Sequence, residues 1–193
     1  RDLQEAYYYM GSVYRDLNDS PRAVTYFNKS AQLAEENSNA DYEILICTYS
    51  QLAVLYKQQF NCNEALRTIL KGLDIAYKIG DSDERTIMNV ASAYEAVNDS
   101  ISSILFCDKA YEMIQKNGIN AENADIVARL MSCYALHGFN EKAHSCYALL
   151  SQIPKCDRPG NYNINLAKYY EQCVSVDSAA SIMLNILDEN NRL

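Results

Sequence analysis

A tyrosine followed nine positions later by a small residue recurs five times along this chain, and this recurrence strongly limits the fold that the chain can adopt. The residue three positions before the tyrosine is small in four of the five copies, and the one before that is always apolar. Regular spacing of this kind predicts repeated helical units, each burying one face against its neighbours. The pairs are Tyr14 and Ala23, Tyr56 and Ala65, Tyr94 and Ser103, Tyr134 and Ala143, and Tyr170 and Ala179.

Glycine and proline are scarce in this sequence. The 193 residues include 6 glycines and 3 prolines, about 3% and 2% against typical usages of about 7% and 5%. Hydrophobic residues make up an ordinary 49%. This composition excludes disordered, collagen-like and most turn-rich all-β chains, and it favours helices. The length predicts one domain or one continuous array.

The first repeat carries the spacing most fully. Its key residues are Tyr7, Met10, Gly11, Tyr14, Ala23 and Phe27. The arrangement resembles the tetratricopeptide repeat, in which small residues let two antiparallel helices approach closely. The resemblance implies an all-α fold: a right-handed α-solenoid of about five helix hairpins, or about ten helices, in a single domain over residues 1–193. The expected repeats span approximately residues 4–37, 40–79, 83–117, 121–153 and 160–190.

Capping residues predict where the second helix of each hairpin begins, because their side chains accept hydrogen bonds from the first backbone N–H groups. The candidate caps are Asp19, Asn63, Asp99, Asn140 and Asp177, each beside a further polar residue. The acidic run 81–85 resembles a calcium loop but has Thr86 where that loop needs glycine, so we expect it to cap a helix beginning near Glu84. The predicted helices span residues 3–16, 20–36, 40–58, 63–79, 83–97, 100–117, 121–137, 140–152, 161–174 and 178–190.

Residues that could carry chemistry are few. The chain has two histidines, His137 and His144, no tryptophan, and seven scattered cysteines without a CxxC pair. Phosphate-loop, nucleophile-elbow and zinc-protease motifs are all missing. We therefore expect no enzymatic activity, no cofactor and no metal site.

The net charge of −8 argues against nucleic acid and anionic membranes as partners, because both bind clustered lysine and arginine. No apolar window approaches the roughly 18 residues of a membrane span, so no membrane contact by this segment is expected. The sequence begins without methionine, which suggests a piece of a longer protein. Its location would be periplasmic if the parent is a membrane-anchored regulator and cytoplasmic otherwise.

The family resemblance also nominates a binding surface. First-helix positions of tetratricopeptide repeats line a concave groove that binds a protein or peptide segment, either extended or helical. Transferred to this sequence, the pattern mixes hydrogen-bonding, charged and apolar side chains. The nominated residues are Tyr8, Ser12, Arg15, Gln51, Val54, Lys57, Arg85, Met88, Asn89, Ser92, Arg129, Ile164, Asn165 and Lys168. The lysine and asparagine clamp of chaperone-binding members is missing, which disfavours chaperone tails as ligands.

Two functional hypotheses remain open. The repeats are longer than the usual 34 residues and resemble arrays of membrane-anchored bacterial transcription regulators and sensor kinases, which implies a sensing or scaffold part of a larger bacterial signalling protein. The alternative is a free-standing oligomeric assembly scaffold or adaptor that self-associates through its last helix. The apolar residues of that helix are Ala179, Ile182, Met183, Ile186 and Leu187.

Overall fold

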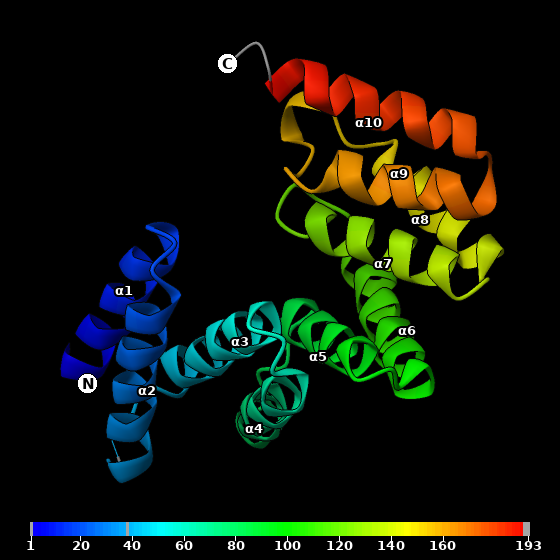
Figure 1. The fold of residues 1–193 in the computed structure, drawn as a ribbon. Helices are drawn as coiled ribbons and strands as arrows, with labels where there is room; N and C mark the ends of the chain where they lie inside the picture. The colour runs from blue at the N-terminus through cyan, green and yellow to red at the C-terminus, as the bar shows by residue number, and fades with distance from the viewer. Residues whose placement is uncertain (1, 38, 191–193) are drawn as a thin grey trace. The chain divides into compact units, whose positions relative to one another are not determined.

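The structure is a computed structural model that describes residues 2–37 and 39–190. Within these residues the chain forms ten α-helices and one short 3-10 helix, η1 (Figure 1). The expected all-α architecture of consecutive helix hairpins is confirmed. The helices are α1 (Asp2–Asp16), α2 (Ser20–Glu36), α3 (Tyr42–Gln58), α4 (Cys62–Ile79), α5 (Glu84–Ala96), α6 (Ser100–Asn117), α7 (Ala124–Leu136), α8 (Asn140–Leu150), η1 (Lys155–Asp157), α9 (Tyr162–Cys173) and α10 (Val176–Asn190).

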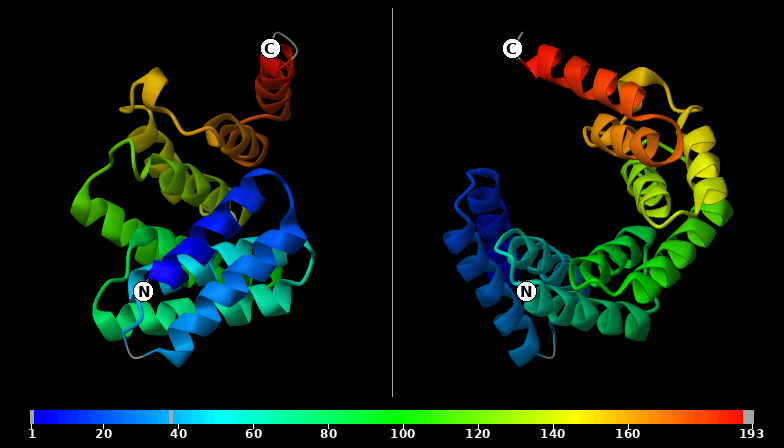
Figure 2. Two further views of the ribbon diagram at one scale, coloured as in Figure 1. Left: turned by 90° about the vertical axis from the view of Figure 1, so that its left-hand side faces the viewer. Right: turned by 45° about the vertical axis from the view of Figure 1, so that its right-hand side comes forward.

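The helices group into two compact units, residues 1–103 and 104–193, and the boundary falls inside α6. In unit 1, α1 pairs with α2 and α3 pairs with α4, while α2 packs on α3 and α4 packs on α5. In unit 2, α7 pairs with α8, α9 pairs with α10, and α7 also packs on α9. Figure 2 shows these helix pairs from two further sides. Among the described residues, none of the helices has both the length and the apolar character needed to cross a bilayer.

The recurring tyrosine marks the turn of every hairpin. The residue five positions after it donates its backbone N–H to the tyrosine carbonyl oxygen, at 2.8–3.0 Å in all five copies. This bond crosses the end of the first helix and satisfies a carbonyl that the helix leaves unpaired. The donors are Asp19, Asn61, Asp99, Phe139 and Ser175.

This register explains which predicted caps are right. Asp19 and Asp99 stand five residues after their tyrosines, and each carboxylate accepts a hydrogen bond from the backbone N–H three positions later. Asp83 caps α5 in the same way, through a 2.7 Å bond from the Thr86 N–H, as the acidic run predicted.

Three of the predicted caps are wrong. Helix α4 begins after Asn61 and α8 begins after Phe139, and neither side chain makes a capping hydrogen bond. At α10 the hydroxyl of Ser175, not the carboxylate of Asp177, accepts from the backbone N–H of Ser178. The turn geometry fixes the first helical residue in each case, so Asn63, Asn140 and Asp177 fall inside their helices.

The small residues of the repeat pattern, three positions before and nine positions after each recurring tyrosine, form the contact between the helices of each hairpin. The second small residue is buried in all five repeats, with Ala23 and Ala143 wholly inaccessible. Gly11 shows how tight this contact is, since a Cβ built on it would lie 2.7 Å from the Phe27 ring. In the fourth repeat Met131 takes the first small position and is itself fully buried.

Candidate peptide-binding face

The nominated residues of unit 1 lie on the three first helices α1, α3 and α5. We call this surface the unit-1 face. Most of its side chains are half-buried, whereas Arg85 is exposed. Met88 is only 4% exposed, so it offers a ligand almost no surface. The unit-1 face comprises Tyr8, Ser12, Arg15, Gln51, Val54, Lys57, Arg85, Met88, Asn89 and Ser92.

Long polar side chains on the unit-1 face bridge neighbouring first helices. Arg15 at the end of α1 donates from Nη1 to Oε1 of Gln51 on α3, at 2.6 Å. Lys57 at the end of α3 donates from Nζ to Oγ of Ser92 on α5, also at 2.6 Å. The Arg15 guanidinium in addition pairs with the exposed carboxylate of Asp16 at 2.8 Å. These bonds hold flexible side chains in fixed positions across successive repeats.

Tyr8 combines packing with exposure. Its ring centroid lies 5.8 Å from that of the buried Phe27 and 5.5 Å from that of the exposed Tyr9. Ser12 donates from its hydroxyl to the Tyr8 carbonyl at 3.2 Å, one turn along α1. Burial is the main reason that the pKa of the Tyr8 phenol is raised. Tyr8 therefore forms the apolar edge of the unit-1 face at α1.

Acidic residues gather where α3 and α5 begin, at one end of the unit-1 face. Asp41 and Asp83 are the N-caps of these helices, and Glu43 and Asp81 stand beside them. The pKa of the exposed Cys47 thiol is raised, first by partial desolvation and then by the charges of these four carboxylates. A cavity of about 460 Å³ opens here. Its lining consists of Ala40, Asp41, Tyr42, Glu43, Ile79 and Asp81.

Gln4 is a structural contact that the sequence reasoning missed. Its amide donates to the Asp41 carbonyl at 2.8 Å and accepts from the Asp41 N–H at 3.0 Å, and its side chain is only 3% exposed. The carbonyl of Gln4 in turn accepts from the Ser30 hydroxyl at 2.9 Å. The glutamine thus ties α1 to the start of α3, next to the acidic end of the unit-1 face.

The nominated residues of unit 2 lie on α7 and α9. Ser132 on α7 donates to Oδ1 of Asn165 on α9 at 2.8 Å, and Asn165 is nearly buried. This bond joins neighbouring first helices, as the Arg15 and Lys57 bonds do in unit 1. Ile164 and Lys168 are exposed on α9, and Arg129 is half-buried on α7.

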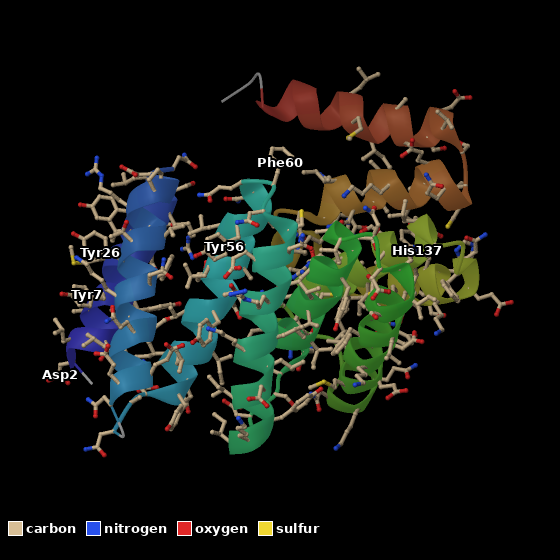
Figure 3. The ribbon with its side chains drawn as sticks, turned by 60° about the horizontal axis from the view of Figure 1, so that its bottom comes forward. Asp2, Tyr7, Tyr26, Tyr56, Phe60 and His137 are labelled. Atoms are coloured by element: carbon tan, nitrogen blue, oxygen red, sulfur yellow. The ribbon has the colours of Figure 1, made fainter. Side chains whose placement is uncertain are left out.

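The histidines occupy different environments in unit 2. His137 is the C-cap of α7 (Figure 3), whereas His144 lies on α8 with its Nδ1 3.0 Å from the Tyr169 hydroxyl. Within either unit taken alone, the described residues bring no three His, Cys, Asp or Glu side chains together as a ligand set.

Known proteins resemble this chain in sequence over part of its length and in its arrangement of helix hairpins. Residues 2–78 match the tetratricopeptide repeat family. This repeat is typically non-catalytic, and no enzyme family is found. No curated protein sequence matches the chain significantly.

Several solved structures share the fold at low sequence identity. The Rap conjugation gene regulator of the plasmid pLS20, solved in complex with the Phr peptide, has a TM-score of 0.77 and 16% identity over 98% of this chain and 52% of that one. BtubC from P. vanneervenii has a TM-score of 0.70 and 20% identity over 91% of this chain and 78% of that one. The TPR-like repeats of a Podosopora anserina kinesin light chain give 0.69 and 12% over 97% and 95%. These likenesses concern the tetratricopeptide-like fold.

Proposed function

We propose that this chain is a non-enzymatic repeat domain that binds a protein or peptide segment along the unit-1 face. Tetratricopeptide repeats generally bind proteins or peptides, which supports this class of function. The observation that carries the proposal is the pair of hydrogen bonds from Arg15 to Gln51 and from Lys57 to Ser92. Side chains ordered before a ligand arrives lose less conformational entropy on binding, so such a surface favours association.

The charges of the unit-1 face suggest the chemistry of the bound segment. Arg15 and Lys57 stand at the C-terminal ends of α1 and α3, while Asp41, Glu43 and Asp83 stand near the N-terminal ends of α3 and α5. A segment crossing the three helices therefore meets carboxylates on one side, and on the other side Arg15 and Lys57 together with the Asp16 carboxylate that pairs with Arg15. We expect it to place a lysine, arginine or amino terminus near Asp41, and carbonyl or carboxylate oxygens near Arg15.

The experiment is a selection from a random peptide library on the purified chain, followed by anisotropy titration of a selected, fluorescently labelled peptide. Val54→Asp places a charge at the centre of the unit-1 face and should weaken binding at least tenfold. Tyr77→Asp is the matched control, because Tyr77 is 51% exposed on α4, a second helix outside this face. Equal affinities for the two variants would place the binding site elsewhere.

We further propose that the domain is the sensing or scaffold part of a larger bacterial regulatory protein. The likeness to the Rap regulator, of which this chain spans about half, supports a regulatory setting with a peptide ligand. Fractionation of the source cells with an antibody to this segment tests the idea by mass and membrane association. A native protein well above 21.8 kDa supports it, whereas a soluble protein near 21.8 kDa indicates a free-standing adaptor.

Self-association through α10 is a second candidate function, favoured by the apolar residues that this helix exposes. Val176, Met183 and Leu184 are 67%, 46% and 62% exposed. The side chains of Ile186 and Leu187 lie outside the described residues. Light scattering of the purified chain should then show an oligomer that Leu184→Lys dissociates, with Ser181→Lys on the same helix as the control. A monomer at high concentration would argue against this candidate.

A further inference from the structure

Two cysteines from different helices meet inside unit 2. Cys107 lies on α6 and Cys133 on α7, and the Cys107 thiol donates to the Cys133 sulfur with the two Sγ atoms 3.2 Å apart. Cys107 is fully buried and Cys133 is half-buried. An S–S bond is about 2.05 Å long, so the two sulfur atoms need to approach by only about 1.1 Å to bond. The other five cysteines make no comparable contact with one another among the described residues.

The helices that carry this thiol pair are fixed in register by the next residue on each. The Tyr134 hydroxyl on α7 donates to the Asp108 carboxylate on α6 at 2.8 Å. Lys142 from α8 donates to the same carboxylate oxygen at 2.5 Å. The ring of Tyr111, one turn further along α6, lies edge-on to that of Tyr134 with centroids 6.1 Å apart. These contacts keep the two sulfur atoms together, and such proximity gives an intramolecular reaction a high effective concentration.

We propose that Cys107 and Cys133 form a reversible oxidation site, in which a low-molecular-weight disulfide such as oxidised glutathione converts the two thiols into a disulfide that links α6 to α7. This proposal does not depend on the peptide-binding function proposed for unit 1.

The difference in exposure sets the order of the two exchange steps. Cys133 is the more exposed of the two residues, so its thiolate attacks the small disulfide, forming a mixed disulfide and releasing one small thiolate. Cys107 then loses its proton to a released thiolate and attacks the Cys133 sulfur, which forms the protein disulfide and expels the second small thiol. In total, two protein thiols are oxidised and one small disulfide is reduced to two thiols. The pKa of the Cys107 thiol is raised by its hydrogen bond to Cys133 and by burial, so Cys107 suits the second step, not the first.

The test uses the whole chain, first reduced, then freed of reductant and incubated with oxidised glutathione. After the remaining thiols are alkylated, trypsin digestion without reduction separates the candidates, because every cysteine falls in its own tryptic peptide. We expect peptide 86–109, which holds Cys107, to be joined to peptide 130–142, which holds Cys133. A reductant should then separate the two peptides again.

Variants distinguish a paired site from general thiol reactivity. In Cys107→Ala the glutathione adduct should stay on peptide 130–142, because no second thiol can displace the glutathione. In the wild-type chain the cross-link should replace this adduct, so that at least tenfold less of the adduct remains than in Cys107→Ala. Cys146→Ala is the matched control, since Cys146 is buried alone in α8, and it should leave the cross-link unchanged. If Cys107→Ala fails to fold, Cys133→Ala replaces it and should leave peptide 86–109 unmodified.

Two results would overturn the proposal. One is a wild-type chain in which the adduct on Cys133 persists as it does in Cys107→Ala. The other is a chain in which the exposed Cys47 and Cys156 react while neither Cys107 nor Cys133 does.

Discussion

Phe60→Gly is expected to stabilise this chain, although phenylalanine is the larger and more apolar residue. Phe60 occupies the hairpin turn between α3 and α4 with φ of 60°, in the left-handed region (Figure 3). The same place is taken by Asn18 and Asn98 in two other hairpins and by Gly138 in a fourth. Glycine adopts this conformation without steric cost, and asparagine tolerates it better than phenylalanine does.

The magnitude follows from two opposing terms. The left-handed conformation costs a residue with a side chain roughly 1–2 kcal/mol, whereas glycine loses about 0.5–1 kcal/mol more conformational entropy on folding. Phe60 is 92% exposed, so its removal gives up almost no buried surface. The net gain in the free energy of unfolding is about 0.5–1 kcal/mol, which for a chain of this length corresponds to a Tm higher by about 1–4 °C.

Thermal unfolding followed by circular dichroism measures this shift, and Gly138→Ala is the reciprocal control. Gly138 has φ of 76° and a Cβ added there would meet nothing within 4 Å, so any loss of stability in this variant comes from the backbone conformation alone. It should melt lower, by a change of similar size to the Phe60→Gly gain. A lower Tm for Phe60→Gly, or an unchanged Tm for Gly138→Ala, would refute the assignment of a shared left-handed turn.

Three further predictions test the packing and the buried groups. Gly11→Ala should cost on the order of 1–3 kcal/mol in urea denaturation, because the added Cβ lies 2.7 Å from the Phe27 ring, and equal stability would mean that α1 and α2 separate easily. Gln4→Ala should cost about 1–3 kcal/mol by removing the side-chain acceptor of the Asp41 N–H and one of the two donors to the Asp41 carbonyl, which still accepts from the Leu45 N–H; Gln4→Glu should restore only the acceptor for the N–H. Burial raises the pKa of the Cys146 thiol to about 12, so the folded state disfavours its ionisation. The contribution of the protonated thiol to the free energy of unfolding is complete below the unfolded thiol pKa of about 8.5 and is lost as pH rises toward 12. Denaturation midpoints measured at a series of pH values should therefore fall less steeply at alkaline pH in Cys146→Ala than in the wild-type chain.

The recurring pattern of tyrosines and small residues predicted most of the fold, because these residues make the helix–helix contacts that every repeat needs. Ala23 and Ala65 are buried as expected, since two helices approach most closely at those positions. The last copy is less complete: Ala179 is buried, but Met183, four residues later, is 46% exposed. Within unit 2 the described part of α10 packs on α9, and this contact leaves Met183 largely exposed.

Other features depend on distances between repeats that no single repeat encodes. Gln4 reaches the backbone of Asp41 only because α1 lies beside the start of α3, and a buried glutamine gives no sequence signal of such a contact. The position of Met88 in its repeat nominated it for the ligand face, yet its side chain is almost completely buried. Repeat position alone predicts the helix on which a residue lies more securely than the direction of its side chain.

In the binding function proposed above, the unit-1 face would have two roles that share the same atoms. Gln51 accepts a hydrogen bond that joins α1 to α3, and Ser92 accepts one that joins α3 to α5. A ligand that accepted hydrogen bonds from Arg15 or Lys57 in place of Gln51 or Ser92 would have to replace the bond that it breaks. Without its partner, the long side chain of Arg15 or Lys57 would no longer be held in the position that favours binding. We therefore expect a ligand to leave these two bonds in place and to contact Arg15 and the half-buried Val54 on α3 beside them. We accordingly expect substitutions at Gln51 or Ser92 to alter both the packing between repeats and the affinity for a ligand, and substitutions at Val54 to alter mainly the affinity.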